Sequence, residues 1–289
     1  MTPRIVVGIC TTGRPDIVAE AVRRLHRQTR PADDIVVAGA VAADLPPLED
    51  ARGVVAPSKG ASAQRNHALD LIGDAADVVV FVDDDYVAAP GFIEGVERLF
   101  SAHPDIVAAS GLLLADGIHS QGLTFEEADA LIVAHEAEGP PADALVPDTG
   151  TYGCNMAFRI AAAPHLRFDE RLPLYSWLED TDFSARIAPF GRIVRATHFY
   201  GVHLGVKRGR GAGLRLGYSQ IANVLYLVRK GTVKPRFGYG QAARNVLANA
   251  VKSLRPEPWV DRRGRLRGNL LALFDALRGR CDPMRILEL

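Results

Sequence analysis

The chain has 289 residues, of which 48% are hydrophobic and 24% are charged, a balance typical of soluble globular proteins. No apolar run approaches the ~18 residues of a membrane-spanning helix, and acidic residues follow the first apolar segment too closely for a signal peptide. The three cysteines, Cys10, Cys154 and Cys281, are far apart and lack metal-ligand spacing, which indicates a reducing cytoplasm and no disulfides.

The formal net charge is zero, but the charges are unevenly distributed along the chain. Residues 1–182 contain 13 Lys and Arg against 29 Asp and Glu, whereas residues 183–289 contain 21 against 5. Such an excess in one half is typical of chains that meet an anionic surface or ligand. Mutual neutralisation of the two halves in the folded protein explains the same balance, and both interpretations stay open.

Apolar runs alternate with helical patterns in the first third of the chain. The predicted strands are residues 4–9, 35–38, 53–56 and 78–82, and the predicted helices are 16–28 and one that Gly60 opens. Strands that alternate with helices at this spacing predict a mostly parallel central sheet with helices on both faces.

The pattern is less regular after residue 85. The expected elements are a helix over 90–100, a strand over 106–110, an irregular segment over 111–150, an extended segment over 152–159 and a helix over 178–187. Helical spacing follows over 214–230 and 240–254, then an arginine-rich connection at 256–268 and a last helix near 269–279. We therefore expect an α/β domain over 1–205 and a basic, mainly helical C-terminal extension over 206–289, packed on the same domain.

Three consecutive acids, Asp83, Asp84 and Asp85, directly follow the predicted strand at 78–82. Carboxylates packed together repel one another and resist burial, so a purely structural role is hard to justify. Mg²⁺ and Mn²⁺ prefer oxygen ligands, and open α/β sheets bind ligands at the carboxyl ends of their strands. The sequence therefore favours a divalent-cation site here over a solvated acidic turn.

A second acidic group, Glu179, Asp180 and Asp182, opens a predicted helix beside Trp177. Acids stabilise the first turn of a helix, and Asp182 can pair with Arg186 one turn later. That structural role leaves three acids in four residues beside a tryptophan unexplained. We therefore favour a role in acid–base chemistry for this group.

Four segments, in this order and spacing, resemble the family 2 inverting glycosyltransferases of the GT-A fold. They are Thr11-Thr12-Gly13-Arg14-Pro15, Ser58 to Asn66, Asp83-Asp84-Asp85, and Trp177 to Asp182. The similarity covers about residues 4–205, and beyond it only a helical tail is shared. It implies a GT-A-type α/β fold and the inverting, metal-dependent transfer of a hexosyl or deoxyhexosyl group from a nucleotide-diphosphate sugar.

The resemblance also implies roles for individual residues. Asp85 would be the metal ligand, His203 a second ligand, and Asp180 the catalytic base. The donor would contact Thr11, Thr12, Arg14, Arg65, Asp83 and Asp84, and the acceptor would contact Trp177 and Glu179. The cofactor would be Mn²⁺ or Mg²⁺. Many relatives carry an acid after the second strand, where this chain has Ala38-Gly39-Ala40.

The implied partners are a nucleotide-diphosphate sugar of the UDP, dTDP or GDP type and a glycan or lipid-linked acceptor, as in polysaccharide biosynthesis, without nucleic acid. The expected location is the cytoplasm, with peripheral contact at the inner face of an anionic membrane. The sequence leaves the transferred sugar, the linkage and the oligomeric state open.

Two other functions fit parts of the sequence. A sugar-phosphate nucleotidyltransferase shares the α/β core and the metal acids, but its first strand is usually followed by a glycine-rich basic loop, of which residues 11–15 are a poor version. A non-enzymatic anion- or nucleic-acid-binding module would use the basic C-terminal half, where aromatic residues are sparse and no recognition motif occurs.

The basic segment 207–215 contains Lys207, Arg208, Arg210 and Arg215, with glycines at 205, 209, 211 and 213 in and beside it. Three interpretations stay open for it. It could close as a lid over the donor pyrophosphate, bind a lipid or anionic membrane surface, or balance the acidic half of the chain.

Overall fold

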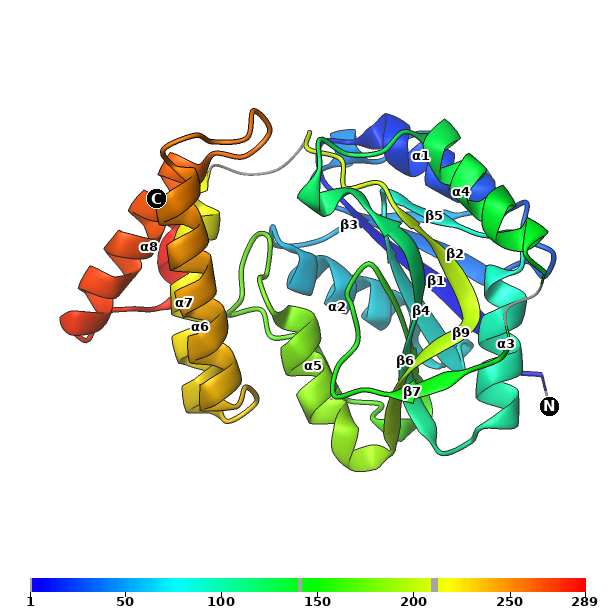
Figure 1. The fold of residues 1–289 in the computed structure, drawn as a ribbon. Helices are drawn as coiled ribbons and strands as arrows, with labels where there is room; N and C mark the ends of the chain where they lie inside the picture. Colours follow the sequence, from blue (N-terminus) through cyan, green and yellow to red (C-terminus); the bar gives the residue numbers. More distant parts are fainter. Residues whose placement is uncertain (1, 140–141, 209–212) are drawn as a thin grey trace.

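The computed structural model describes residues 2–139, 142–208 and 213–289. Its centre is a nine-stranded mixed sheet with the order β3-β2-β1-β4-β8-β6-β9-β5, and β7 pairs with β9. Figure 1 shows this sheet between two layers of helices, with three C-terminal helices grouped to one side. None of the helices in the described ranges is both long and apolar enough to cross a membrane.

The predicted parallel half of the sheet is confirmed. Strands β1 (Ile5–Thr11), β2 (Asp34–Gly39), β3 (Arg52–Val55) and β4 (Val78–Asp83) pair in parallel, and α1 (Pro15–Leu25) and α2 (Ala61–Ile72) connect them. Alternate residues of β1 enter opposite layers: Ile5 packs with residues of α1, and Val6 with residues of α2. Burial on both faces explains why these strands are continuous apolar runs.

The other half of the sheet is built around a long strand, β9 (Arg192–His203), which the sequence pattern did not indicate. It pairs in parallel with β6 (Ile106–Asp116) and antiparallel with β5 (Tyr86–Ala88) and β7 (Leu145–Pro147), while β8 (Asn155–Arg159) joins β6 to β4. Arginine, threonine and histidine interrupt the apolar residues of β9, so it lacks the run by which the other buried strands were predicted.

The helices that cover this half are α3 (Phe92–Ala102), α4 (Phe125–Ala137) and α5 (Glu179–Ile187). Helices α3 and α5 confirm the sequence prediction. The expectation of an irregular segment over 111–150 is wrong, because β6 extends to Asp116 and α4 follows. A capping box starts α4: Thr124 accepts the N–H of Glu127, and Glu127 accepts the N–H of Thr124.

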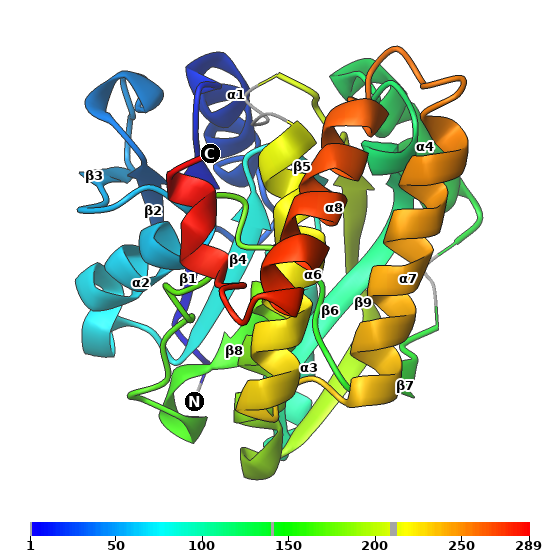
Figure 2. The same ribbon diagram turned by 90° about the vertical axis from the view of Figure 1, so that its left-hand side faces the viewer.

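The C-terminal extension consists of α6 (Gly213–Lys230), α7 (Pro235–Lys252), α8 (Arg262–Leu277) and a short 3₁₀ helix (Pro283–Leu287). The predicted connection at 256–268 is wrong in its second half, because the Asp261 carboxylate accepts the N–H of Gly264 and caps α8 there. A buried amide network joins the three helices: Asn249 donates to Gln220 and Asn269. Figure 2 shows α8 in front of α6, with α7 to the right of both.

Candidate active site

Asp83, Asp85 and His203 meet at one edge of the sheet. Strand β4 ends at Asp83, and the pairing of β5 with β9 sets His203 opposite Tyr86, the residue after Asp85. The Nε2 atom of His203 lies 3.3 Å from Asp85 Oδ1 and 3.7 Å from Asp83 Oδ2. One ligand atom from each of the three residues lies within 4.8 Å of the others. The tertiary structure thus brings together two carboxylates and an imidazole from distant parts of the chain.

This donor set fits a divalent cation. Carboxylate oxygens suit Mg²⁺ and Mn²⁺, and an imidazole nitrogen suits transition metals. The His203 Nδ1 atom lies 2.8 Å from Asp116 Oδ1, which orients the ring so that Nε2 faces the two acids, as outer-shell carboxylates do for metal-binding histidines. Tyr152 donates its hydroxyl to the other oxygen of Asp116, at 2.9 Å. Neither residue was among the predicted site residues, because the strand that carries Asp116 was expected to end at residue 110 and Tyr152 lies in a segment predicted only as extended.

The surroundings of the cluster favour an ionised Asp85 and a protonated His203. Burial alone would raise the pKa of Asp85, but His203, Arg14 and the N–H of Val206 hold it at about 2. Burial alone would lower the pKa of His203, but hydrogen bonds to Asp116 and Asp85 raise it to about 10. A cation bound here would take the place of the proton on His203.

Asp84 points away from the cluster and holds the loop after β1. Its side chain is fully buried, accepts the hydroxyl of Thr11 at 2.7 Å and lies 2.7 Å from the Arg14 guanidinium. Burial raises the pKa of Asp84 to about 7 although Arg14 opposes the shift. Arg14 also lies 3.2 Å from Asp85, whereas Thr12 is exposed at the surface. The three consecutive acids therefore have different surroundings.

A further acid, Asp44, fixes the same loop from the next strand. It ends a short 3₁₀ helix after β2 and is buried. One carboxylate oxygen accepts the N–H of Gly13 at 2.7 Å, and the other accepts the N–H groups of Ala40 and Val41 at 2.9 and 3.0 Å. Asp44 is thus the acid that follows β2 in this chain, and its carboxylate binds main-chain N–H groups of the two loops. Asp44 lies in an Ala/Pro-rich loop with no periodic pattern, so no sequence signal marks it as a site residue.

Arg65 connects the metal cluster to the second acidic group. It projects from α2, is buried, and forms an ion pair with Glu179. Its Nη2 atom donates to the carbonyl of Gly153 at 3.1 Å and lies 3.7 Å from Asp83. The Glu179 carboxylate is consequently buried against Arg65.

Asp180, the second residue of α5, is held by main-chain N–H groups. Its Oδ2 atom accepts from Gly153 at 3.0 Å, and its Oδ1 atom accepts from Thr181 at 2.7 Å. Burial raises the pKa of Asp180, and these hydrogen bonds oppose the shift. Gly153 therefore bridges two site residues, since its carbonyl binds Arg65 and its N–H binds Asp180. A β-carbon at Gly153 would lie 3.2 Å from Arg65 Nη2 and 3.5 Å from Asp180 Oδ2. The position therefore favours glycine, and no sequence motif indicates this.

Trp177 lies in a conformationally restrained loop before α5. Its ring stacks on Tyr175 with centroids 6.3 Å apart. Leu174, Ser176 and Leu178 have φ values of 58°, 54° and 71°, the left-handed region that non-glycine residues rarely adopt. The loop is held from both sides, because Ser176 accepts the N–H of Ser62 at 3.1 Å and the Trp177 carbonyl accepts from Asn223 of α6 at 2.9 Å. Strained loops of this kind concentrate at functional sites.

The start of the basic segment lies against the metal cluster. Val206 donates its N–H to Asp85 at 2.7 Å, Lys207 donates to the carbonyls of Gly117 and Ile118 at 2.9 and 3.0 Å, and Arg208 pairs with Asp16. Gly209, Arg210 and Gly211 lie outside the described residues. Arg215 belongs to α6 and donates to the C-terminal carbonyl at 3.4 Å.

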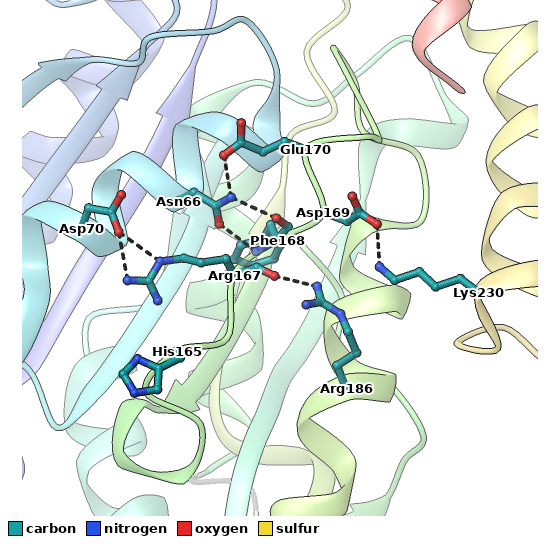
Figure 3. A pocket seen from close by; sticks show the side chains of 9 residues that line it. All are labelled: Asn66, Asp70, His165, Arg167, Phe168, Asp169, Glu170, Arg186 and Lys230. Atoms are coloured by element: carbon teal, nitrogen blue, oxygen red, sulfur yellow. Dashed lines mark hydrogen bonds and ion pairs between the residues drawn. The ribbon is translucent and has the colours of Figure 1, made fainter. Parts of the chain in front are cut away.

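A hollow of about 490 Å³ lies apart from this cluster, between α2, α5 and α6 (Figure 3). Its basic side chains are paired: Arg167 with Asp70, Arg186 with Asp182, and Lys230 with Asp169 and Asp182. Asn66, from the segment that precedes the acidic strand, accepts the N–H of Phe168 and donates to its carbonyl. These interactions shape the loop at 165–170, and the hollow has no cluster of metal-ligating groups among the described residues.

No family model and no curated protein sequence matches the chain. Several solved structures are similar to the chain in fold. The mannosyltransferase PcManGT from Pyrobaculum calidifontis, in complex with GDP-Man and Mn²⁺, has a TM-score of 0.53 at 17% identity, over 99% of this chain and 85% of that one. S. aureus TarS 1–349 has a TM-score of 0.54 at 14% identity, over 99% and 90%.

GalNAc-T7 with UDP, GalNAc and Mn²⁺ has a TM-score of 0.54 at 11% identity, over 99% of this chain and 56% of that one. The chain spans 40% of the longer S. aureus TarS chain. At such identities the similarities show the fold alone. They confirm the GT-A-type fold that the sequence motifs predict.

Proposed function

We propose that this protein is an inverting, metal-dependent glycosyltransferase that moves a sugar from a nucleotide-diphosphate donor to a hydroxyl of a glycan or lipid-linked acceptor. The proposal rests on one observation: the side chains of Asp83, Asp85 and His203 lie close together, beside the loop of Thr11 to Arg14. The cluster lies in a fold shared with glycosyltransferases solved with GDP-Man or UDP and with Mn²⁺.

The metal site and the arginines act on the donor side. Asp83, Asp85 and His203 would hold Mn²⁺ or Mg²⁺, which as a Lewis acid stabilises the charge of the departing diphosphate. Arg14 and Arg65, each within ion-pair distance of these acids, add fixed positive charge at the same edge of the sheet. Thr11 is engaged with Asp84, whereas Thr12 is exposed on the same loop and available to the nucleotide.

Asp180 is the proposed catalytic base. A sugar hydroxyl is a poor nucleophile until a base accepts its proton, and burial makes Asp180 a stronger base than a surface aspartate. A direct displacement by the activated hydroxyl inverts the anomeric carbon. Trp177 presents its ring in the loop before α5 and is the proposed acceptor contact. Glu179, buried on Arg65, serves as a positioning residue in this proposal.

Asp85→Ala tests the proposal through thermal stability with UDP, GDP and dTDP, each with and without Mn²⁺. A ligand that binds only the folded protein adds about 2.7 kcal/mol to the unfolding free energy at a concentration of 100 Kd, and so raises the melting temperature. We expect one nucleotide to stabilise the unmodified protein only with Mn²⁺, and Asp85→Ala to lose that effect. Asp143→Ala, which removes an exposed acid, is the matched control and should keep it.

The same assay separates the alternatives. A nucleotide–Mn²⁺ effect accompanied by slow hydrolysis of a nucleotide sugar supports glycosyl transfer. Pyrophosphate release from a nucleoside triphosphate with a sugar 1-phosphate would instead identify a nucleotidyltransferase. If no nucleotide stabilises the protein with Mn²⁺, the proposal is wrong.

A further inference from the structure

Helices α7 and α8 expose apolar side chains on the side away from the α/β domain. The largest exposed groups are Leu247 and Val251 on α7, at 66% and 60%, and Leu270, Phe274 and Leu277 on α8, at 56%, 48% and 89%. Figure 2 shows α8 in front of α6, and α7 next to them. We call the exposed residues of these two helices the α7–α8 face.

The exposed residues form a stripe along each helix. Leu247 and Val251 are four residues apart, as are Leu270 and Phe274, and Leu277 follows three residues later, so each set repeats at the helical period. The opposite side of each helix is buried, with Asn249 on α7 and Ala272 and Asp275 on α8. Each helix thus has a second, unpartnered apolar stripe in addition to the side that packs in the bundle. Contiguous exposed apolar surfaces of this kind mark binding sites.

The same two helices are almost free of acidic residues. They contain seven Lys and Arg and one acid, Asp275, which is buried and bonded to Tyr218 and Arg285. Arg236 and Arg244 on α7 and Arg263 and Arg267 on α8 are exposed beside the apolar stripes, whereas Lys252 pairs with Glu257 at 2.7 Å.

Other basic residues of the C-terminal half are neutralised by the acidic half. Arg208 pairs with Asp16, and Lys230 pairs with Asp169 and Asp182. Mutual neutralisation therefore accounts for part of the charge asymmetry, whereas no acid among the described residues forms a salt bridge with Arg236, Arg244, Arg263 or Arg267.

We propose that the α7–α8 face binds an anionic lipid bilayer as a peripheral surface. The leucines, Val251 and Phe274 enter the boundary between headgroups and acyl chains, and the flanking arginines contact lipid phosphates. The loop at 253–261, which joins the two helices, exposes Leu254, at 81%, and Trp259, a residue type enriched at membrane interfaces.

The charge distribution selects lipid over a second copy of the chain. A symmetric dimer through this face would set the same surface against itself and bring the arginines of both copies together. An anionic bilayer offers apolar depth and negative charge in the same plane. The inference stands on α7 and α8 and is independent of the reaction; its corollary, a lipid-linked acceptor, rests on the proposed function.

Co-sedimentation of the full chain with vesicles tests the inference, without nucleotide or metal. We expect binding to mixed phosphatidylcholine–phosphatidylglycerol vesicles, weak binding to pure phosphatidylcholine, and a decrease with salt. Each arginine near the surface is worth about fivefold in partition, so Arg244→Gln with Arg267→Gln should weaken binding about 25-fold. Leu247→Ser with Leu277→Ser should also release the protein. Val133→Ser, which changes an equally exposed apolar residue on α4, should bind normally.

Equal binding to both vesicle types, or unchanged binding by either double variant, would overturn the inference. So would a dimer in light scattering that binds no vesicles and dissociates on Leu247→Ser with Leu277→Ser, because the face would then be an interface between copies. Thermal stabilisation by nucleotide and Mn²⁺, measured on the same variants, should be unchanged. Its loss in the unmodified protein would refute the proposed function and leave the lipid result standing.

Discussion

Replacement of Asp180 by asparagine is expected to separate catalysis from structure. The change keeps the size of the side chain and removes its capacity to accept a proton. Each Asp180 oxygen accepts a main-chain N–H, from Gly153 at 3.0 Å and from Thr181 at 2.7 Å. An asparagine has one oxygen, so its amide nitrogen must face one of these donors. We therefore expect a loss of about 1–3 kcal/mol of unfolding free energy, the cost of a buried donor left unpaired.

The kinetic loss should be larger than the structural one. General-base catalysis contributes about 10²–10⁴ in rate, which corresponds to about 2.7–5.4 kcal/mol of activation free energy. We expect kcat to fall by this factor, while the Kd for nucleotide with Mn²⁺ changes little, because the donor residues remain in place. Initial rates with the donor that the nucleotide screen selects, urea unfolding and nucleotide titration measure the three quantities. Thr181→Ala, which removes only a 3.3 Å hydroxyl contact to Asp180, is the matched control.

The pH dependence gives an independent check. Burial raises the pKa of Asp180 above that of an ordinary aspartate, ~3.9. The base acts deprotonated, so activity should be complete above the raised pKa and lost as the pH falls through it. This acid limb should be absent from the residual activity of Asp180→Asn. Near-normal turnover by Asp180→Asn, or a product that NMR shows to retain the anomeric configuration of the donor, would refute the assignment.

Three further changes test the surroundings of the site. Asp116→Asn should weaken Mn²⁺ binding about 10–100-fold, because it removes the carboxylate that orients His203; an unchanged Mn²⁺ titration would exclude that role. Arg65→Ala should cost about 3–5 kcal/mol in urea unfolding, since it leaves Glu179 buried and unpaired, and adding Glu179→Gln should restore part of the loss; no restoration would argue against the pair. Gly60→Ala should destabilise the protein by about 1–3 kcal/mol or more, because residue 60 has φ of 137° and a β-carbon would lie 2.7 Å from the Leu174 nitrogen; an unchanged melting temperature would contradict this geometry.

The amino-acid sequence by itself determined the parallel half of the sheet and the chemistry at its edge. Strands β1 to β4 are continuous apolar runs because both faces are buried, and α1 and α2 follow them with helical spacing. Three consecutive acids that begin at the last residue of β4 predicted a charged edge, and the family resemblance implied that His203 is a metal ligand with Asp85. The structure confirms that Asp83, Asp85 and His203 lie together. Local sequence is informative here because strand, turn and acid are contiguous.

The tertiary structure alone decided which distant residues complete the site. His203 reaches Asp85 through the pairing of β9 with β5, and Asp116 reaches His203 through the pairing of the second half of β6 with β9. Asp44 and Gly153 likewise act through hydrogen bonds to loops far along the chain. Strand order is set by main-chain pairing between remote segments, and main-chain donors and acceptors are the same for every residue type except proline. The residues that such pairing brings together therefore leave no periodic pattern in the sequence.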